Sequence, residues 1–223
     1  MQFSTRTALA TSIFSLLLAA SNPTLAQPTE QKAATKPAAA AAAPSLKVVQ
    51  TQAALRDLWV GHVFWVRNVV EASIGGNAAA AAAAEAEVVA NAKQIAGAIE
   101  PFYGKPASDK LLTLLVGHYT PIKQYMEATI AGDKGKQDAA SKALTENAGE
   151  IATFLSGANP NLPKEAVRGL LLAHGAHHIQ QIQQFKDKKY AEEGKTWEAM
   201  KAHMYVISDA IAGALVKQFP AKF

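Results

Sequence analysis

The sequence predicts an all-α protein, a six-helix up-and-down bundle made of three tandem helical hairpins with a 56-residue repeat. Three observations predict this class. Alanine supplies 47 of the 223 residues, a strong bias toward helix. From residue 46 onward, apolar residues recur with helical spacing, and no segment alternates with the two-residue period of a strand. His62, His118 and His174 lie 56 residues apart within similar flanking sequences.

The first 45 residues are expected to lie outside the bundle. Residues 1–26 are typical of a signal peptide, because Arg6 precedes a mostly apolar run and small residues precede Gln27. Residues 27–45 are rich in Ala and Pro and are expected to form a disordered linker before the domain at 46–223. The apolar run is too short to span a bilayer. We therefore expect an exported protein, periplasmic or secreted, with no transmembrane segment in the mature chain.

The first hairpin is predicted to consist of helices at residues 46–74 and 78–100. Leu55, Trp59 and His62 lie on one stripe of the first helix, which Gly75-Gly76-Asn77 ends. The second helix is expected to end before Pro101, since proline has no N–H to continue the hydrogen-bond ladder.

The second and third hairpins follow the same pattern. A helix is expected to begin near Pro106, followed by one at about 136–156 that Gly157 and Pro160 close. Pro163 is expected in the first turn of the fifth helix, and the sixth helix is expected at about 193–219.

Six polar residues are predicted to lie at one height in this bundle. In antiparallel helices of equal rise, residues equidistant from the connecting turn lie at the same level. One residue of each helix meets this condition: His62, Asn91, His118, Asn147, His174 and His203.

A buried layer of imidazoles and amides needs hydrogen-bond partners or a ligand, because an unpartnered polar group in an apolar core costs about 1–3 kcal/mol. Imidazole is a common metal ligand, and bundle cores are usual metal sites. The layer therefore predicts that a divalent transition metal or a small ligand binds there, and a metal would be Zn, Cu, Ni or Fe, since the chain has no cysteine. The candidate ligands are His62, His118, His174 and His203, with His178 as an additional candidate, and the candidate cofactor-lining residues are Asn91, Asn147 and Trp59.

Two other functions stay open at this point. The layer can be closed by its own hydrogen bonds, which would suit a structural or interaction module of the cell envelope. An enzyme is the third alternative, but the sequence has no G-x-S-x-G, no phosphate-binding G-x-x-x-x-G-K-[ST] and no H-E-x-x-H motif. The sequence therefore favours binding without catalysis. A net charge of +4 does not indicate a nucleic-acid partner, and no other partner or oligomeric state is predicted.

Four segments resemble an uncharacterised family of small exported bacterial helical proteins: residues 55–62 with Trp65, 99–104, 154–160 and 217–220. The resemblance runs from about Leu46 to the C-terminus. It implies that the histidines and asparagines of the layer belong to the family pattern, in which an acidic residue often precedes the histidine. This chain has Gly61 and Gly117 there. Some members carry a glycosyltransferase name, which the motifs of this chain do not support. Residues 174–181 are also similar to the metal-binding helix of DinB-like bundles.

Overall fold

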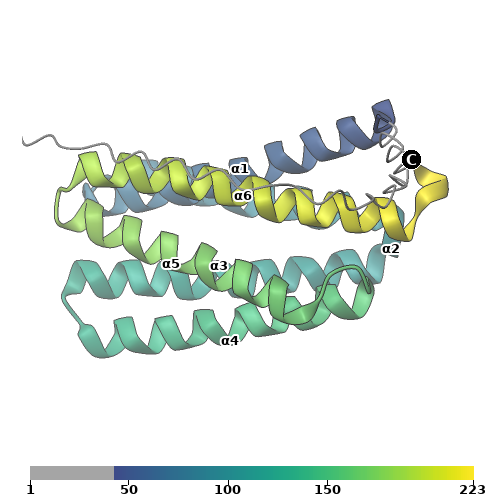
Figure 1. The fold of residues 1–223 in the computed structure, drawn as a ribbon. Coiled ribbons are helices and arrows are strands. Elements are labelled where there is room, and N and C mark those ends of the chain that lie inside the picture. Colours follow the sequence, from purple (N-terminus) through teal and green to yellow (C-terminus); the bar gives the residue numbers. More distant parts are fainter. Residues whose placement is uncertain (1–42) are drawn as a thin grey trace, which may run out of the picture. The chain divides into compact units, whose positions relative to one another are not determined.

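The computed structural model describes residues 43–223, which form six α-helices and a short 3₁₀ helix at Pro220–Lys222 (Figure 1). The helices are α1 (Leu46–Ile74), α2 (Ala78–Tyr103), α3 (Lys105–Ala131), α4 (Lys134–Ala158), α5 (Lys164–Lys186) and α6 (Tyr190–Gln218). No strand occurs between residues 43 and 223. The predicted signal peptide, and the predicted linker up to residue 42, lie outside the described residues.

The six helices form an up-and-down bundle, which confirms the predicted fold class (Figure 1). Each helix packs against the next one in the chain, and α6 packs against α1. α5 makes additional contacts with α1 and α3, so it lies closest to the interior of the bundle. Side chains on the inner faces of α1, α3 and α5 can therefore meet.

The prediction that the second helix ends before Pro101 is wrong, because α2 continues through Pro101 to Tyr103. Proline removes one hydrogen bond, here to the carbonyl of Gly97, but Gly97 lies on the exposed face, where water can replace the lost donor. The extra turn is held by tertiary packing, since Phe102 and Tyr103 contact the ring of Phe219. Packing thus overrides the local stop signal.

Apolar clusters lie on both sides of the histidine layer. On α1, Leu55 and Trp59 belong to one cluster, and Val66 and Val70 belong to another. His62 lies between these two groups and is itself buried. The histidines are therefore enclosed in the middle of the bundle. None of the described helices is long and apolar enough to cross a membrane.

Candidate metal centre

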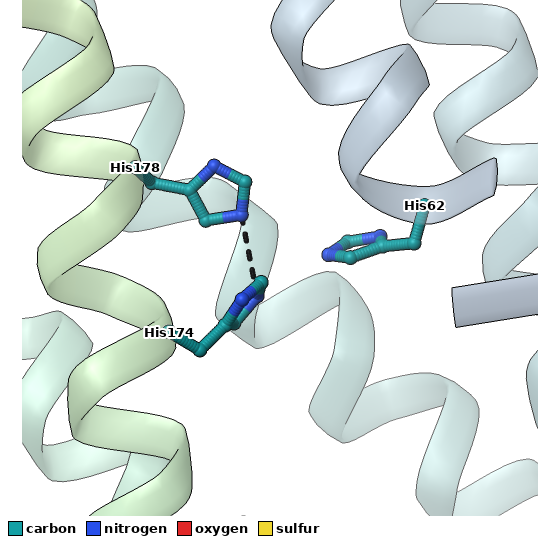
Figure 2. Close-up of side chains that lie close together, drawn as sticks. All are labelled: His62, His174 and His178. Atoms are coloured by element: carbon teal, nitrogen blue, oxygen red, sulfur yellow. Dashed lines mark hydrogen bonds between the residues drawn. The ribbon is translucent and has the colours of Figure 1, made fainter. Parts of the chain in front are cut away.

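Three buried histidines from two helices come close together in the bundle interior. His62 lies on α1, and His174 and His178 lie on α5. One ring nitrogen from each of them lies within 4.8 Å of the others. The residues are only 4%, 1% and 1% exposed, respectively. Figure 2 shows the His62 ring pointing toward the pair on α5. We call these residues the three-histidine site.

The spacing of His174 and His178 explains why α5 supplies two of these rings. Residues four apart lie on the same face of a helix, one turn above the other. Their Nε2 atoms are 3.2 Å apart (Figure 2). Two imidazole nitrogens on a tetrahedral zinc ion, each about 2.0–2.1 Å from the metal, are about 3.3–3.4 Å apart. The pair therefore already has the separation that chelation of one ion requires.

His118 on α3 lies beside the three-histidine site but outside it. Its ring stacks on His174, with centroids 5.4 Å apart and planes inclined by 17°. Its Nδ1–H donates to Asn147 Oδ1 at 3.0 Å, because the Asn147 amide nitrogen already donates to the Leu114 carbonyl. This bond leaves the His118 Nε2 lone pair free, buried and without a protein partner. An oxygen that accepts from the second ring nitrogen is typical support for a metal-ligating histidine.

The structure does not bring His203 into this group. His203 is half-buried on α6, and its Nε2–H donates to the Leu170 carbonyl at 2.8 Å. Its ring lies 5.7 Å from His177, a neighbour that is also only half-buried. The two asparagines of the layer are buried, but their amide nitrogens donate to helix carbonyls, as His203 does, and neither belongs to the three-histidine site. The predicted six-residue layer therefore converges only through residues of α1, α3 and α5.

One hydrogen bond recurs three times along the chain. The side chains of Asn91, Asn147 and His203 donate to the carbonyls of Leu58, Leu114 and Leu170, and each bond spans 33 residues. Each of these carbonyls lies four residues before His62, His118 or His174. The even-numbered helices thus fix the backbone turns that carry the interior histidines.

Gly61 and Gly117 make two of these bonds sterically feasible. A Cβ atom on Gly61 would lie 3.2 Å from the Asn91 Nδ2, and one on Gly117 would lie 3.1 Å from the Asn147 Nδ2. An acidic side chain at either position would displace the amide. The third hairpin has Ala173 at the equivalent position, opposite His203 rather than an asparagine.

Trp59, the third candidate lining residue, packs against the site from α1. Its ring meets the ring of His62 edge-on, with centroids 6.2 Å apart. Trp59 is buried within an apolar cluster that includes Val63 and Met204. It therefore helps to exclude water from one side of His62.

Burial keeps the interior histidines neutral. Loss of hydration lowers the pKa of His62 to about 3 and the pKa of His118 to about 4. The same effect, followed by repulsion from neighbouring histidines, holds the pKa values of His174 and His178 well below their usual range. Neutral imidazole is the form that binds metals, so at pH 7 no imidazolium has to lose its charge. Only the proton shared by the Nε2 atoms of His174 and His178 has to move to a ring Nδ1 before both Nε2 atoms can bind an ion.

A buried carboxylate near the site was not predicted from the sequence. Glu193 on α6 accepts two bonds from Arg67, at 2.7 and 2.6 Å, and one from Gln181 at 2.9 Å. Gln181 lies three residues after His178 on the inward face of α5, and this helical spacing is the one sequence signal for the network. Because Arg67 pairs with Glu193 through both carboxylate oxygens, we assign Glu193 to the link between α1, α5 and α6 rather than to metal binding.

Comparisons with protein-family models, with curated proteins and with solved structures find no match for this chain. Function is therefore argued from the geometry of the three-histidine site.

Proposed function

We propose that this protein is exported and binds one transition metal ion at the three-histidine site, without catalysing a reaction of its own. One observation carries the proposal: three buried, neutral imidazoles place their ligand nitrogens within 4.8 Å of one another. Nitrogen ligands without thiolate or carboxylate suit Zn, Cu, Ni or Fe. Export rests on the signal-like pattern of residues 1–26.

Unpartnered ring nitrogens also favour a ligand in this part of the bundle. His62 Nδ1, His118 Nε2 and His174 Nδ1 are buried and bond to no protein group. Leaving a buried polar atom without a partner costs about 1–3 kcal/mol. A layer that evolved only as a hydrogen-bonded network would be expected to pair these atoms with one another.

Metal content provides the first test. The full chain is purified without a histidine tag, and its metals are measured by mass spectrometry. The metal-free protein is then titrated with Zn²⁺, Cu²⁺, Ni²⁺ and Fe²⁺ while its unfolding is followed. We expect one ion per chain and a stabilisation of about 2.7 kcal/mol at a free metal concentration of 100 times Kd. No bound metal and no stabilisation by any of these ions would falsify the proposal.

The chain offers a matched pair of variants for this test. Val66 and Ile122 lie 112 and 56 residues before His178, at the positions that correspond to it in the first two hairpins, and both are buried. His178→Ile therefore introduces the residue that the second hairpin has at the corresponding position. We expect this variant to fold and to lose metal binding. His177→Gln changes the half-buried neighbouring histidine and should bind metal like the original protein. Equal binding by His178→Ile would contradict the proposed ligand set.

A structural role is the second candidate, and two hydrogen bonds favour it. His174 pairs with His178, and His118 pairs with Asn147, using protein groups only. In this case His178→Ile would leave the buried His174 Nε2 unpaired and destabilise the protein by about 1–3 kcal/mol, and no metal would change the unfolding of the original protein. The same experiment therefore separates the two functions.

A further inference from the structure

A small cavity between α2 and α3 ends on a member of the three-histidine site. Its volume is about 40 Å³, and His62 forms part of its wall. Val88, Ala92 and Ile95 line it from α2 and are buried. Val89 and Val116 also line it and are 40% and 47% exposed. The cavity therefore extends from the bundle surface to His62.

The size and the wall of this cavity restrict what it can hold. A cavity needs a volume of roughly 10–15 Å³ to hold one water molecule. At about 40 Å³, this cavity therefore has room for a molecule of two or three atoms. Apart from His62 and the hydroxyl of Tyr119, its lining side chains are apolar. Apolar cavities of this kind take up apolar guests rather than ions.

The three-histidine site would leave one coordination position of a bound metal ion open. Three protein ligands leave the fourth position of a tetrahedral ion open to an exogenous ligand. His62 is shared between the ligand group and the cavity wall. A larger groove of about 720 Å³ over α3, α4 and α5 is lined mostly by charged residues, and no histidine lines it.

We propose that the cavity between α2 and α3 admits a diatomic apolar molecule of the class of dioxygen, nitric oxide or carbon monoxide to the metal at His62. The inference rests on the proposed metal binding and sharpens it, because iron and copper are the ions that proteins use to bind such gases. The step is reversible ligation, and no bond of the gas is broken.

Xenon tests the cavity without any metal. The metal-free protein is placed under xenon pressure, and methyl resonances are followed by NMR. We expect saturable shifts at Val88 and Ala92, and none at Val206, which lies on the surface of α6. Absence of shifts at the cavity methyls would overturn the inference.

Nitric oxide tests ligation. The protein loaded anaerobically with Fe²⁺ is mixed with nitric oxide, and the adduct is measured by electron paramagnetic resonance. Ala92→Leu fills the cavity, so we expect its association rate to fall at least about tenfold. Ala148→Leu makes the same change at the equivalent buried position of α4 and serves as the control.

Surface variants keep the test decisive if either leucine variant fails to fold. Val116→Phe narrows the exposed end of the cavity, and Val206→Phe is its control on another exposed face. Slower adduct formation in Val116→Phe alone supports the inference. Equal rates in all variants, or no adduct with bound Fe²⁺, overturn it.

The metal titration also separates the proposed metal binding from the proposed gas binding. If the protein binds Zn²⁺ but neither Fe²⁺ nor copper, the proposed metal binding survives and the gas-binding inference fails. If no metal binds, both fail.

Discussion

The first and second hairpins carry the same His–Asn pair but use it differently. In the second hairpin, His118 Nδ1–H donates to Asn147 Oδ1 at 3.0 Å. In the first hairpin the corresponding atoms, His62 Nδ1 and Asn91 Oδ1, are both buried and unpartnered. Yet Asn91 holds the Leu58 carbonyl just as Asn147 holds that of Leu114.

The difference lies in the histidine ring rather than in the backbone. His62 is not held by its asparagine, and it belongs to the group with His174 and His178. His118 is held by its asparagine and lies outside that group. Equal spacing in sequence therefore does not give equal roles.

The third hairpin decides where the site forms. At the level one turn after the repeated histidine, the first two hairpins have Val66 and Ile122, and the third has His178. α5 also contacts both α1 and α3, so its two rings are within reach of both neighbours. The extra imidazole on α5 makes the site asymmetric.

A fall in pH should have the largest effect on stability, and it should act on the first and second hairpins alike. The four buried histidines have pKa values lowered by burial, so between about pH 6.5 and pH 4 the unfolded chain binds more protons than the folded chain. Stability is therefore full above pH 6.5 and falls as the pH drops through this window. The free energy of unfolding should fall by up to about 1.4 kcal/mol per pH unit for each histidine, and by roughly 5 kcal/mol per pH unit for all four.

Urea unfolding of the metal-free protein at pH 7.5, 6.5 and 5.5 measures this slope. His62→Leu and His118→Leu should each reduce it by about a quarter, since each removes one of four titrating groups. A stability that does not change between pH 7.5 and 5.5 would contradict the burial of the four imidazoles.

Metal affinity should separate the two hairpins. We expect His62→Leu to weaken binding more than about 100-fold, since loss of a ligand exceeds the 10–100-fold effect of its supporting groups. His118→Leu should weaken binding less than about 10-fold, because His118 lies outside the ligand group. Isothermal titration calorimetry with the ion found in the purified protein measures both. Equal losses would show that His118 also binds the ion.

The asparagines should differ in their contributions to stability. Asn147→Ala removes the bonds to His118 and to Leu114 and leaves a buried N–H unpaired, so we expect a loss of about 2–3 kcal/mol. Asn91→Ala removes only the bond to Leu58, so we expect about 1 kcal/mol. Urea unfolding at pH 7.5 gives both values. Equal losses would mean that the His118–Asn147 bond adds no stability.

The smallest effect is expected at the turn of the third hairpin. Lys188 has a φ of 59°, whereas the turns of the first two hairpins place Gly76 and Gly132 in the left-handed region. Lys188→Gly should therefore stabilise the protein by about 1 kcal/mol. Lys186→Gly, within the last turn of α5, should instead destabilise it by about the same amount. Thermal unfolding of both variants checks the two signs.

Much of the fold could be predicted from local signals. Helical spacing of apolar residues and the turn residues around Gly76, Gly104 and Gly132 located all six helices to within a few residues. The end of α2 was missed, because packing of Phe102 and Tyr103 on Phe219 outweighs the stop signal of Pro101. Glu193 was missed for a similar reason, since its partners Arg67 and Gln181 lie on other helices.

The sequence by itself determined the helices, the turns and the level at which one polar residue of each helix lies, because these depend on rise per residue and on short-range propensity. Only the tertiary structure decided which of these side chains face one another. His62, His174 and His178 meet, while His203 bonds to the Leu170 carbonyl. The physical reason is that rotation of each helix about its axis, and the rotamer of each ring, are set by packing against neighbouring helices rather than by position along the chain.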